Sequence, residues 1–222
     1  MERGRGGGPE QLLLPHLNYL LLLGWAPEGE QEIFNLDEMI RIWDPTRISK
    51  SPAIFDPLKL RAINAAYIRA LPAEEFRRLA DPFIDQAVHR DIDRDLLCAN
   101  LQPRCEVLED IPPQLDFFDA VLPFDAELYR NKKQKTTPES AKEALEALLP
   151  VLENETDWNR DAIFEVCRSK AEAMEKKNGW LLYPLGIALS GKSRTPGGGT
   201  DLAAMLGKEE TLARLRAALA AL

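Results

Sequence analysis

Helix-start signals recur along this chain and constrain its fold more than any other feature. Asp-Pro pairs stand at residues 44–45, 56–57 and 81–82, each ahead of a segment with apolar residues at helical spacing. Asp caps the free amides at a helix start, and proline tolerates the first helical position. The spaced apolar residues after position 56 are Leu60, Ile63, Ala66, Tyr67 and Ala70, and those after position 81 are Phe83, Ile84, Ala87 and Val88. Each Asp-Pro pair therefore predicts a helix start, with a shorter helix around residues 76–79 between the last two.

The second half of the chain continues this pattern. Thr137-Pro138 predicts the start of one helix, Asp157 the start of the next, and Asn178-Gly179 the end of that one. Thr200 predicts a short helix ending near residue 207, and the last apolar stripe comprises Leu212, Leu215, Leu219 and Leu222. Residues 180–199 differ, because an apolar run without helical period leads into Thr195-Pro196-Gly197-Gly198-Gly199. We expect an all-α fold with a short irregular Gly/Pro-rich segment near 180–199.

Charge and cysteine content exclude several classes of protein. Only 7% of residues are aromatic, 29% are charged and the formal net charge is -8. This balance argues against a protein that coats nucleic acid by bulk electrostatics, although it leaves room for a local basic strip. Cys98, Cys105 and Cys167 are odd in number and lack C-x-x-C spacing, which predicts neither a disulfide framework nor a metal site. We expect a cytoplasmic protein.

The amino-terminal region imitates a signal peptide only loosely. Two arginines precede an apolar stretch over residues 12–25, but Pro15, His16 and Asn18 interrupt it and no small-residue cleavage site follows. The stretch is too short and too broken to span a bilayer. We expect residues 1–12 to form a flexible tail and the protein to have no membrane partner.

A nucleotide-binding motif occurs late in the chain and is interpreted as false. Residues 186–193 read GIALSGKS and satisfy the P-loop pattern, whose backbone amides wrap phosphates. That loop needs a preceding strand and a helix directly after it, whereas Pro196 and three glycines follow here. A surface turn is the favoured interpretation. A second short match, Ile48-Ser49-Lys50-Ser51, echoes the KMSKS loop of class I synthetases, but no HIGH-type partner accompanies it.

Longer blocks carry a family resemblance. The segments LNYLLLLGW (17–25), PEGEQEIF (27–34), ISKSPAIFD (48–56), LRAINAAYIR (60–69), LQPRCEVLEDIP (101–112), KKQKT (132–136) and residues 178–216 resemble the region beyond the KMSKS loop of bacterial glutamyl-tRNA synthetases. The resemblance covers nearly everything after residue 12. It implies an all-α superhelix of the class I synthetase anticodon-binding type that receives the anticodon arm of tRNA.

The resemblance also implies a domain plan. Residues 13–70 resemble a helical stem-contact region, residues 71–126 a first anticodon-binding subdomain and residues 127–222 a second one. The catalytic domain would precede Met1, so ATP and magnesium are expected only there, and this chain alone is expected to be inactive as a ligase. The implied partners are tRNA, above all tRNA-Glu, and a catalytic domain in cis or in trans. We expect a monomer that does not bind DNA.

Arg104 is the leading site residue by this resemblance. The arginine of the family's L-x-P-R block reads the last anticodon base, and Gln102 of the same block is assigned to the anticodon with it. A guanidinium offers only donors, so it suits the N3 and O2 acceptors of cytosine and not the N1-H and N2-H donors of guanine. Arg104 could instead cap the preceding helix or pair with Glu106 or Glu109.

One position departs from the family pattern. The family commonly has an arginine where this chain reads Tyr183-Pro184-Leu185-Gly186, and a glycine lacks the side chain needed for base readout. A helical structural or interaction protein that no longer reads tRNA is therefore the alternative function.

Candidate contacts to the tRNA backbone are the other polar and basic residues of the matched blocks, namely Asn64, Tyr67, Arg69, Lys132, Lys133, Lys192 and Arg194. Tyr67 could equally well pack in the core. The lysines could simply form a solvated face without a partner. Trp180 or Tyr183 could stack an unpaired base, although buried packing is favoured for both.

Overall fold

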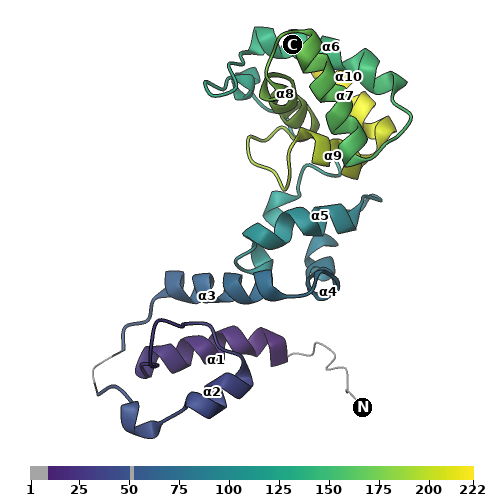
Figure 1. Cartoon of the computed structure of the whole chain (residues 1–222). Helices are drawn as coiled ribbons and strands as arrows, with labels where there is room; N and C mark the ends of the chain where they lie inside the picture. Colours follow the sequence, from purple (N-terminus) through teal and green to yellow (C-terminus); the bar gives the residue numbers. More distant parts are fainter. Residues whose placement is uncertain (1–9, 51–52) are drawn as a thin grey trace. The chain divides into compact units, whose positions relative to one another are not determined.

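Helices form the framework of this chain. The computed structural model describes residues 10–50 and 53–222, and within that range the extended pairing is limited to two isolated β-bridges (Figure 1). The all-α prediction is confirmed. The predicted flexible tail lies outside the described residues for positions 1–9, and the first helix, α1 (Glu10–Gly24), begins within its last three residues.

The described chain divides into two compact units. Unit 1 comprises the described part of Met1–Leu79 together with Gln102–Asp110, and unit 2 comprises Ala80–Leu101 with Ile111–Leu222. The chain passes from one unit to the other after residues 79, 101 and 110. The segment Gln102–Asp110, which carries the L-x-P-R arginine, thus belongs with the amino-terminal helices.

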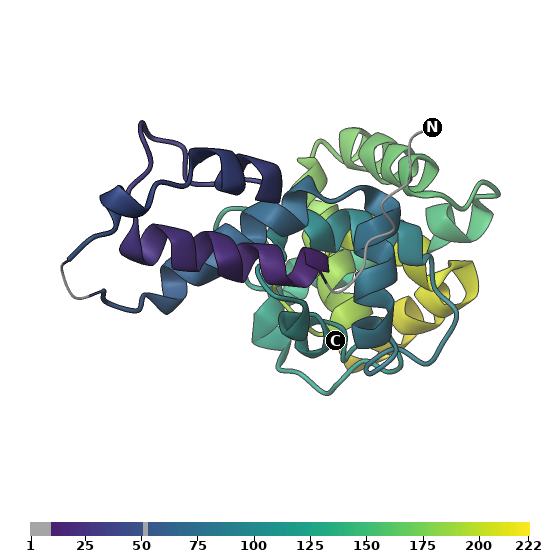
Figure 2. The same cartoon turned by 90° about the horizontal axis from the view of Figure 1, so that it is seen from below.

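Unit 1 is built on two helices that lie along each other, α1 and α3 (Pro57–Ala70) (Figures 1 and 2). Asp56 caps α3 as predicted, because its Oδ1 accepts from the amide of Leu58 at 2.9 Å. The remaining elements are α2 (Leu36–Ile42), η1 (Pro45–Arg47), the first part of α4 (Ala73–Ile84), η2 (Gln102–Arg104) and η3 (Leu108–Asp110). The pair at Asp44-Pro45 starts only the three-residue η1.

A buried asparagine ties the helices of unit 1 together. Asn18 is fully buried, its Nδ2 donates to Glu32 O at 2.7 Å, and its Oδ1 accepts from Phe34 N at 2.8 Å. The hydroxyl of Tyr67 on α3 donates to the same Oδ1 at 3.0 Å. All polar atoms of a buried amide need partners, so this set fixes the register of α1 against α3.

Unit 2 surrounds the apolar helix α8 (Asn178–Ser190). This helix packs against α6 (Pro138–Asn154), α7 (Arg160–Ala173), α9 (Gly199–Leu206) and α10 (Lys208–Ala221). The other elements of the unit are the end of α4, α5 (Arg94–Leu101), η4 (Pro112–Gln114) and η5 (Ala126–Tyr129). The predicted cap at Thr137 is confirmed, because its Oγ1 accepts from Ser140 N at 3.2 Å and Ser140 Oγ accepts in return from Thr137 N.

The helix predicted to start at Asp81-Pro82 is wrong. Pro82 lies inside α4, which begins at Ala73. The side chains of Phe76, Ala80 and Ile84 are each 0% exposed and stand four residues apart, on one helical stripe. Burial of this stripe keeps the chain helical although Pro82 removes one backbone hydrogen bond.

The irregular conformation predicted for residues 180–189 is also wrong, because they form most of α8. This helix is buried on most sides, so its sequence lacks the polar face that gives a surface helix its period. Asn178-Gly179 starts α8 and does not end α7, which stops at Ala173. The cap of α7 is Asn159, two residues after the predicted Asp157. The irregular Gly/Pro-rich stretch is confirmed for residues 191–198.

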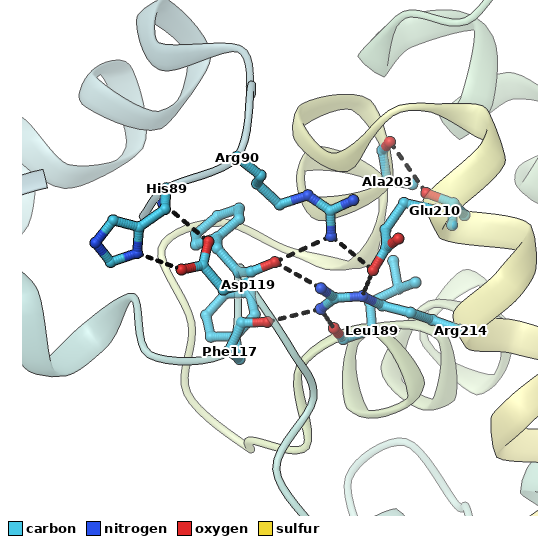
Figure 3. A network of polar contacts seen from close by, with 10 residues as sticks. His89, Arg90, Phe117, Asp119, Leu189, Ala203, Glu210 and Arg214 are labelled. Carbon is cyan, nitrogen blue, oxygen red and sulfur yellow. Dashed lines mark hydrogen bonds and ion pairs between the residues drawn. The ribbon is translucent and has the colours of Figure 1, made fainter. Parts of the chain in front are cut away.

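A buried arginine anchors residues 117–119 to α10. Arg214 is 6% exposed, and its Nη1 donates to Phe117 O at 2.8 Å and to Leu189 O at 2.6 Å. Its Nε donates to Glu210, which also pairs with Arg90 at 2.6 Å (Figure 3). The hydrogen bond from Arg90, together with that from Arg214, lowers the pKa of Glu210 to about 2. Burial lowers the pKa of Arg214. Close by, the Asp119 carboxylate pairs with His89 at 2.6 Å.

Candidate RNA interface

Arg104 is an exposed side chain at the end of the η2 turn. The two carboxylates that could pair with it, Glu106 and Glu109, do not reach it in the described part of the chain. Glu106 is held by Arg61 on α3 instead, with Nε to Oε2 at 2.7 Å, and Arg61 also pairs with Asp110. Since its acidic neighbour is occupied, the guanidinium of Arg104 keeps its donors available to a partner from outside.

The turn that presents Arg104 is fixed to the last turns of α3. Gln102 donates through Nε2 to Ile68 O at 3.0 Å and to Leu71 O at 2.8 Å. Both carbonyls lie at the carboxyl end of α3, where helices leave such groups short of intrahelical partners, and Ile68 O also accepts from the amide of Leu71 at 3.2 Å. On the other side of Arg104, Asn64 Nδ2 donates to Glu106 O. The arginine therefore stands on a short turn tied down at both flanks.

The buried side chain of Cys105 also holds this turn in place. Its side chain is 4% exposed, and burial raises the pKa of the thiol to about 12. Like Cys98 and Cys167, it is a buried cysteine outside any disulfide, and its Sγ donates to Val107 O at 3.3 Å. The amide nitrogen of Gln102 is bonded to the end of α3, which leaves its amide oxygen for a contact with tRNA. That contact stays a prediction.

The three backbone candidates on α3 do not act together. Asn64 is occupied by the η2 turn, and Tyr67 donates its hydroxyl within unit 1, where burial raises its pKa to about 12. Arg69 is exposed and has no ion pair or hydrogen bond with any described residue. Asn64 and Tyr67 thus have structural roles here, and Arg69 alone keeps its donors available.

The basic candidates of unit 2 also separate into two groups. Lys132 and Lys133 are exposed at the tip of a hairpin closed by the bridge between Asn131 and Thr136, and Arg194 is exposed in the turn after α8. Lys192 instead pairs with Asp116 and donates to Pro113 O at 3.2 Å. Of the four, Lys192 is the one held by the protein.

The residues of the P-loop match do not form a loop. Residues 186–190 belong to α8, whose amides bond within the helix, and only positions 191–193 form a turn. Trp180 is 6% exposed, and Tyr183 donates its hydroxyl to Leu128 O at 2.8 Å. The ring of Trp180 is therefore covered, and Tyr183 is half-buried with its hydroxyl held by the protein. Gly186 faces Gly199, where an added Cβ would lie 3.7 Å from the Gly199 nitrogen.

Arg61 is a site residue that the sequence reasoning missed. It stands three residues before Asn64 on α3, so both lie on one helix face and both hold the segment around Glu106. The sequence held one signal for Arg61: Glu106, Glu109 and Asp110 follow Arg104 closely. If Arg104 is to stay unpaired, another cation must lie near these carboxylates.

A cavity of about 680 Å³ lies in unit 2 and contains none of the predicted site residues. It is lined by residues 119–124, by Ala126, Tyr129 and Ala188, and by the alanine-rich face of α10 with the Glu210–Arg214 pair. Across the described residues, no cluster of three or more His, Cys, Asp or Glu side chains is spaced to hold a metal. No described helix combines the length and the apolar character that crossing a bilayer requires.

Comparison with known proteins connects this geometry to a family. A family model described as an anticodon binding domain matches residues 65–219. The chain is 45% identical over 200 residues to the glutamate–tRNA ligase of Clostridium botulinum strain Hall, which covers 90% of this chain and 41% of the relative. The Clostridium tetani glutamate–tRNA ligase is 44% identical over the same shares of the two chains. The chain thus spans about two fifths of the length of these relatives.

Solved structures agree with this relationship. The glutamate tRNA ligase of Elizabethkingia meningosepticum, crystallised in complex with its amino acid, superposes with a TM-score of 0.81 at 26% identity, covering 99% of this chain and 44% of that one. The synthetase of Elizabethkingia anophelis shares the fold with a TM-score of 0.79 at 23% identity. From the match over residues 65–219 and this structural likeness, the chain belongs to the anticodon-binding domain family, with glutamate–tRNA ligases among its relatives.

Proposed function

We propose that this chain binds tRNA and that Arg104 reads the last base of the anticodon. The observation that carries the proposal is the state of Arg104, an exposed guanidinium without a partner among the described residues, on a turn fixed by Gln102 and Asn64. A guanidinium that served only the fold would engage a carboxylate or a helix end. Here Arg61 holds Glu106 and Asp110, two of the three nearby carboxylates.

The chemistry of Arg104 favours one tRNA over another. Its donors match the N3 and O2 acceptors of a splayed-out cytosine, whereas guanine would oppose them with its own N1-H and N2-H donors. A good bidentate contact of this kind discriminates between bases by about 1–3 kcal/mol. We therefore propose tRNA-Glu as the cognate partner and tRNA-Gln as the rejected one.

Direct binding tests this proposal. Dissociation constants of labelled tRNA-Glu and tRNA-Gln would be measured for the wild-type chain, Arg104→Gln and Arg104→Lys. We expect wild type to prefer tRNA-Glu about tenfold or more, and Arg104→Gln to lose most of that preference. Arg41→Gln is the matched control, because Arg41 is also exposed and without a described partner in unit 1. Equal binding of both tRNAs by wild type would refute the readout.

A catalytic domain, in cis or in trans, is the second partner we propose. Large exposed apolar side chains of the described chain concentrate between Leu13 and Leu58, with Leu122 the exception. On α1 they include Leu13, Leu17 and Leu20 with the spacing of one helix face, and at α2 they include Leu36 and Ile40 on the helix and Trp43 directly after it. Apolar faces of this kind mark interaction sites. ATP and magnesium would act in that domain.

The partner test uses the remaining portion of the Clostridium botulinum ligase, produced separately. Calorimetry should show binding to this chain, weakened at least about tenfold by Leu17→Asp or Ile40→Asp. Unchanged binding by both variants would contradict the docking face. Under this proposal the chain is a cytoplasmic monomer until that partner binds, which light scattering would check.

A further inference from the structure

Five lysines from two distant segments form a basic surface on unit 2, here named the lysine surface. It consists of Lys132, Lys133 and Lys135 on the hairpin over residues 131–136, and of Lys176 and Lys177 just before α8. The two segments meet because Gln134 lies directly against Gly179, where a Cβ would come 1.7 Å from its Oε1. A side chain at position 179 would displace the end of the Gln134 side chain.

No acid neutralises these lysines within the segments that carry them. Residues 131–138 and 176–183 contain no Asp or Glu, although the whole chain has a formal net charge of -8. All five lysines are exposed, and none of them has an ion pair with a described residue. Lys176 lies over the Trp180 ring, 4.8 Å from its centroid. Glu139 and Glu175 flank the two segments, so the five lysines are a local concentration of positive charge on an acidic protein.

The start of α8 adds to the same field. Lys177 is the cap residue of this helix, and within the described chain no side chain caps its free amides. Its first turn carries no acidic residue. Unpaired amides and the helix dipole favour an anion at this end. The positive end of the helix dipole therefore adds to the positive charge of the lysines.

We infer that the lysine surface contacts the phosphate backbone of RNA and supplies affinity without regard to base identity; this rests on the proposed tRNA binding. Sequence alone pointed to the basic run of Lys132, Lys133 and Lys135, and the fold adds Lys176 and Lys177 to it. The nearby ring of Trp180 is unavailable for stacking, since it is buried beneath Lys176. Phosphate is therefore the group that this surface recognises, and base reading is left to Arg104.

Lys135 gives an independent sign that charge is required here. Its φ is 55°, a left-handed conformation that glycine adopts more readily than lysine. Lys135→Gly should therefore relieve the backbone while it removes one positive charge. We expect this variant to melt at the same or a higher temperature and to bind RNA more weakly. A lysine kept only for the fold would not give this combination.

Salt dependence is the decisive measurement. The dissociation constants of tRNA-Glu and tRNA-Gln transcripts would be measured from 50 to 300 mM potassium chloride for wild type, for the pairs Lys132→Gln with Lys133→Gln and Lys176→Gln with Lys177→Gln, and for the five-lysine variant. Each lysine on a phosphate contributes about 0.7–0.9 to the slope of log affinity against log salt. Each pair should lower the slope by up to about 2 and weaken both tRNAs by the same factor.

A charge-matched control comes from the far end of α6. Lys208 and Arg216 contact Glu153, and Lys208 also contacts Glu155, whereas the hairpin adjoins the start of this helix at Thr137. The two ends are separated by about 24 Å along the axis, which exceeds the roughly 8–10 Å Debye length. Replacing Lys208 and Arg216 by Gln should leave the slope unchanged.

The outcomes separate this inference from the base readout. A slope unchanged in the five-lysine variant would overturn the lysine surface, even if Arg104→Gln abolishes discrimination. A lowered slope with no discrimination in wild type would uphold the lysine surface and refute the readout. Binding of an acidic polyglutamate peptide through these lysines, with the RNA slope unaffected, would identify a protein contact and also overturn the inference. Failure of wild type to bind RNA would refute both.

Discussion

Glu210→Gln should change stability in a way that depends on pH. The Glu210 carboxylate pairs with Arg90 at 2.6 Å and accepts from Arg214 Nε at 2.7 Å, which lowers its pKa from 4.5 to about 2. A carboxyl with a depressed pKa in the folded state stabilises that state above its unfolded pKa, and this stability is lost as the pH falls through the folded pKa. The contribution is therefore complete above about pH 5 and nearly gone at pH 2.

The magnitude follows from the size of that change. Since one pKa unit corresponds to about 1.4 kcal/mol, the full contribution is roughly 3 kcal/mol. Because the side chain is 26% exposed, solvent screening reduces this to about 2–3 kcal/mol. The difference between wild type and Glu210→Gln should hold this value at pH 7, fall to about half near pH 3 and shrink further below it.

Urea denaturation of both proteins at pH 7, 5, 4 and 3 measures the difference. Other carboxyls with lowered pKa, among them Asp119 beside His89, titrate in both proteins and cancel in the comparison. Arg90→Gln is the matched variant, because it removes the larger cause of the low pKa and should also flatten the pH dependence. A difference between wild type and Glu210→Gln that stays constant from pH 7 to pH 3 would refute the reasoning.

Three further changes have definite expected results. Gln102→Ala should lower the free energy of unfolding by about 1–3 kcal/mol in urea titrations, because Leu71 O loses the Gln102 donor and Ile68 O keeps only the amide of Leu71; no change would remove its anchoring role. Thr137→Ala should cost about 1 kcal/mol in the same assay, because the capping box with Ser140 is lost. Gly186→Arg, at a position where an added Cβ makes ordinary contact with Gly199 at 3.7 Å, should raise tRNA affinity about tenfold in a binding titration, with Gly186→Ala as the control for the backbone. Unchanged affinity there would contradict a nearby anticodon.

Local capping signals predicted the fold well where a helix start is exposed. Asp56 and Thr137 cap α3 and α6 because their side chains bond to amides two or three residues ahead, within the same short stretch of sequence. The sequence predicted a helix start at Pro82, but Pro82 lies inside α4. Burial of the apolar stripe of α4 stabilises the helix in spite of the proline, and a local sequence pattern does not show that burial. Helix α8 was missed because a helix covered on most sides has no polar face to show.

The candidate site was predictable only in part. The L-x-P-R block identified Arg104, but its availability depends on Arg61, which lies 45 positions from its partner Glu106. Lys132 and Lys133 lie on one surface with Lys176 and Lys177 because Gln134 packs against Gly179. Tyr67 and Lys192 were assigned to tRNA by residue type, and the fold gives both of them partners within the protein. Side-chain partners across such distances come from tertiary packing, which local patterns do not contain.

The most direct test of the readout by Arg104 is a double-mutant cycle between protein and RNA. Dissociation constants would be measured for wild type and Arg104→Gln, each with tRNA-Glu and with a tRNA-Glu whose last anticodon base is changed from cytosine to guanine. The account predicts a coupling energy of about 1–3 kcal/mol between the side chain and the base. A coupling energy within about 0.3 kcal/mol of zero would contradict it.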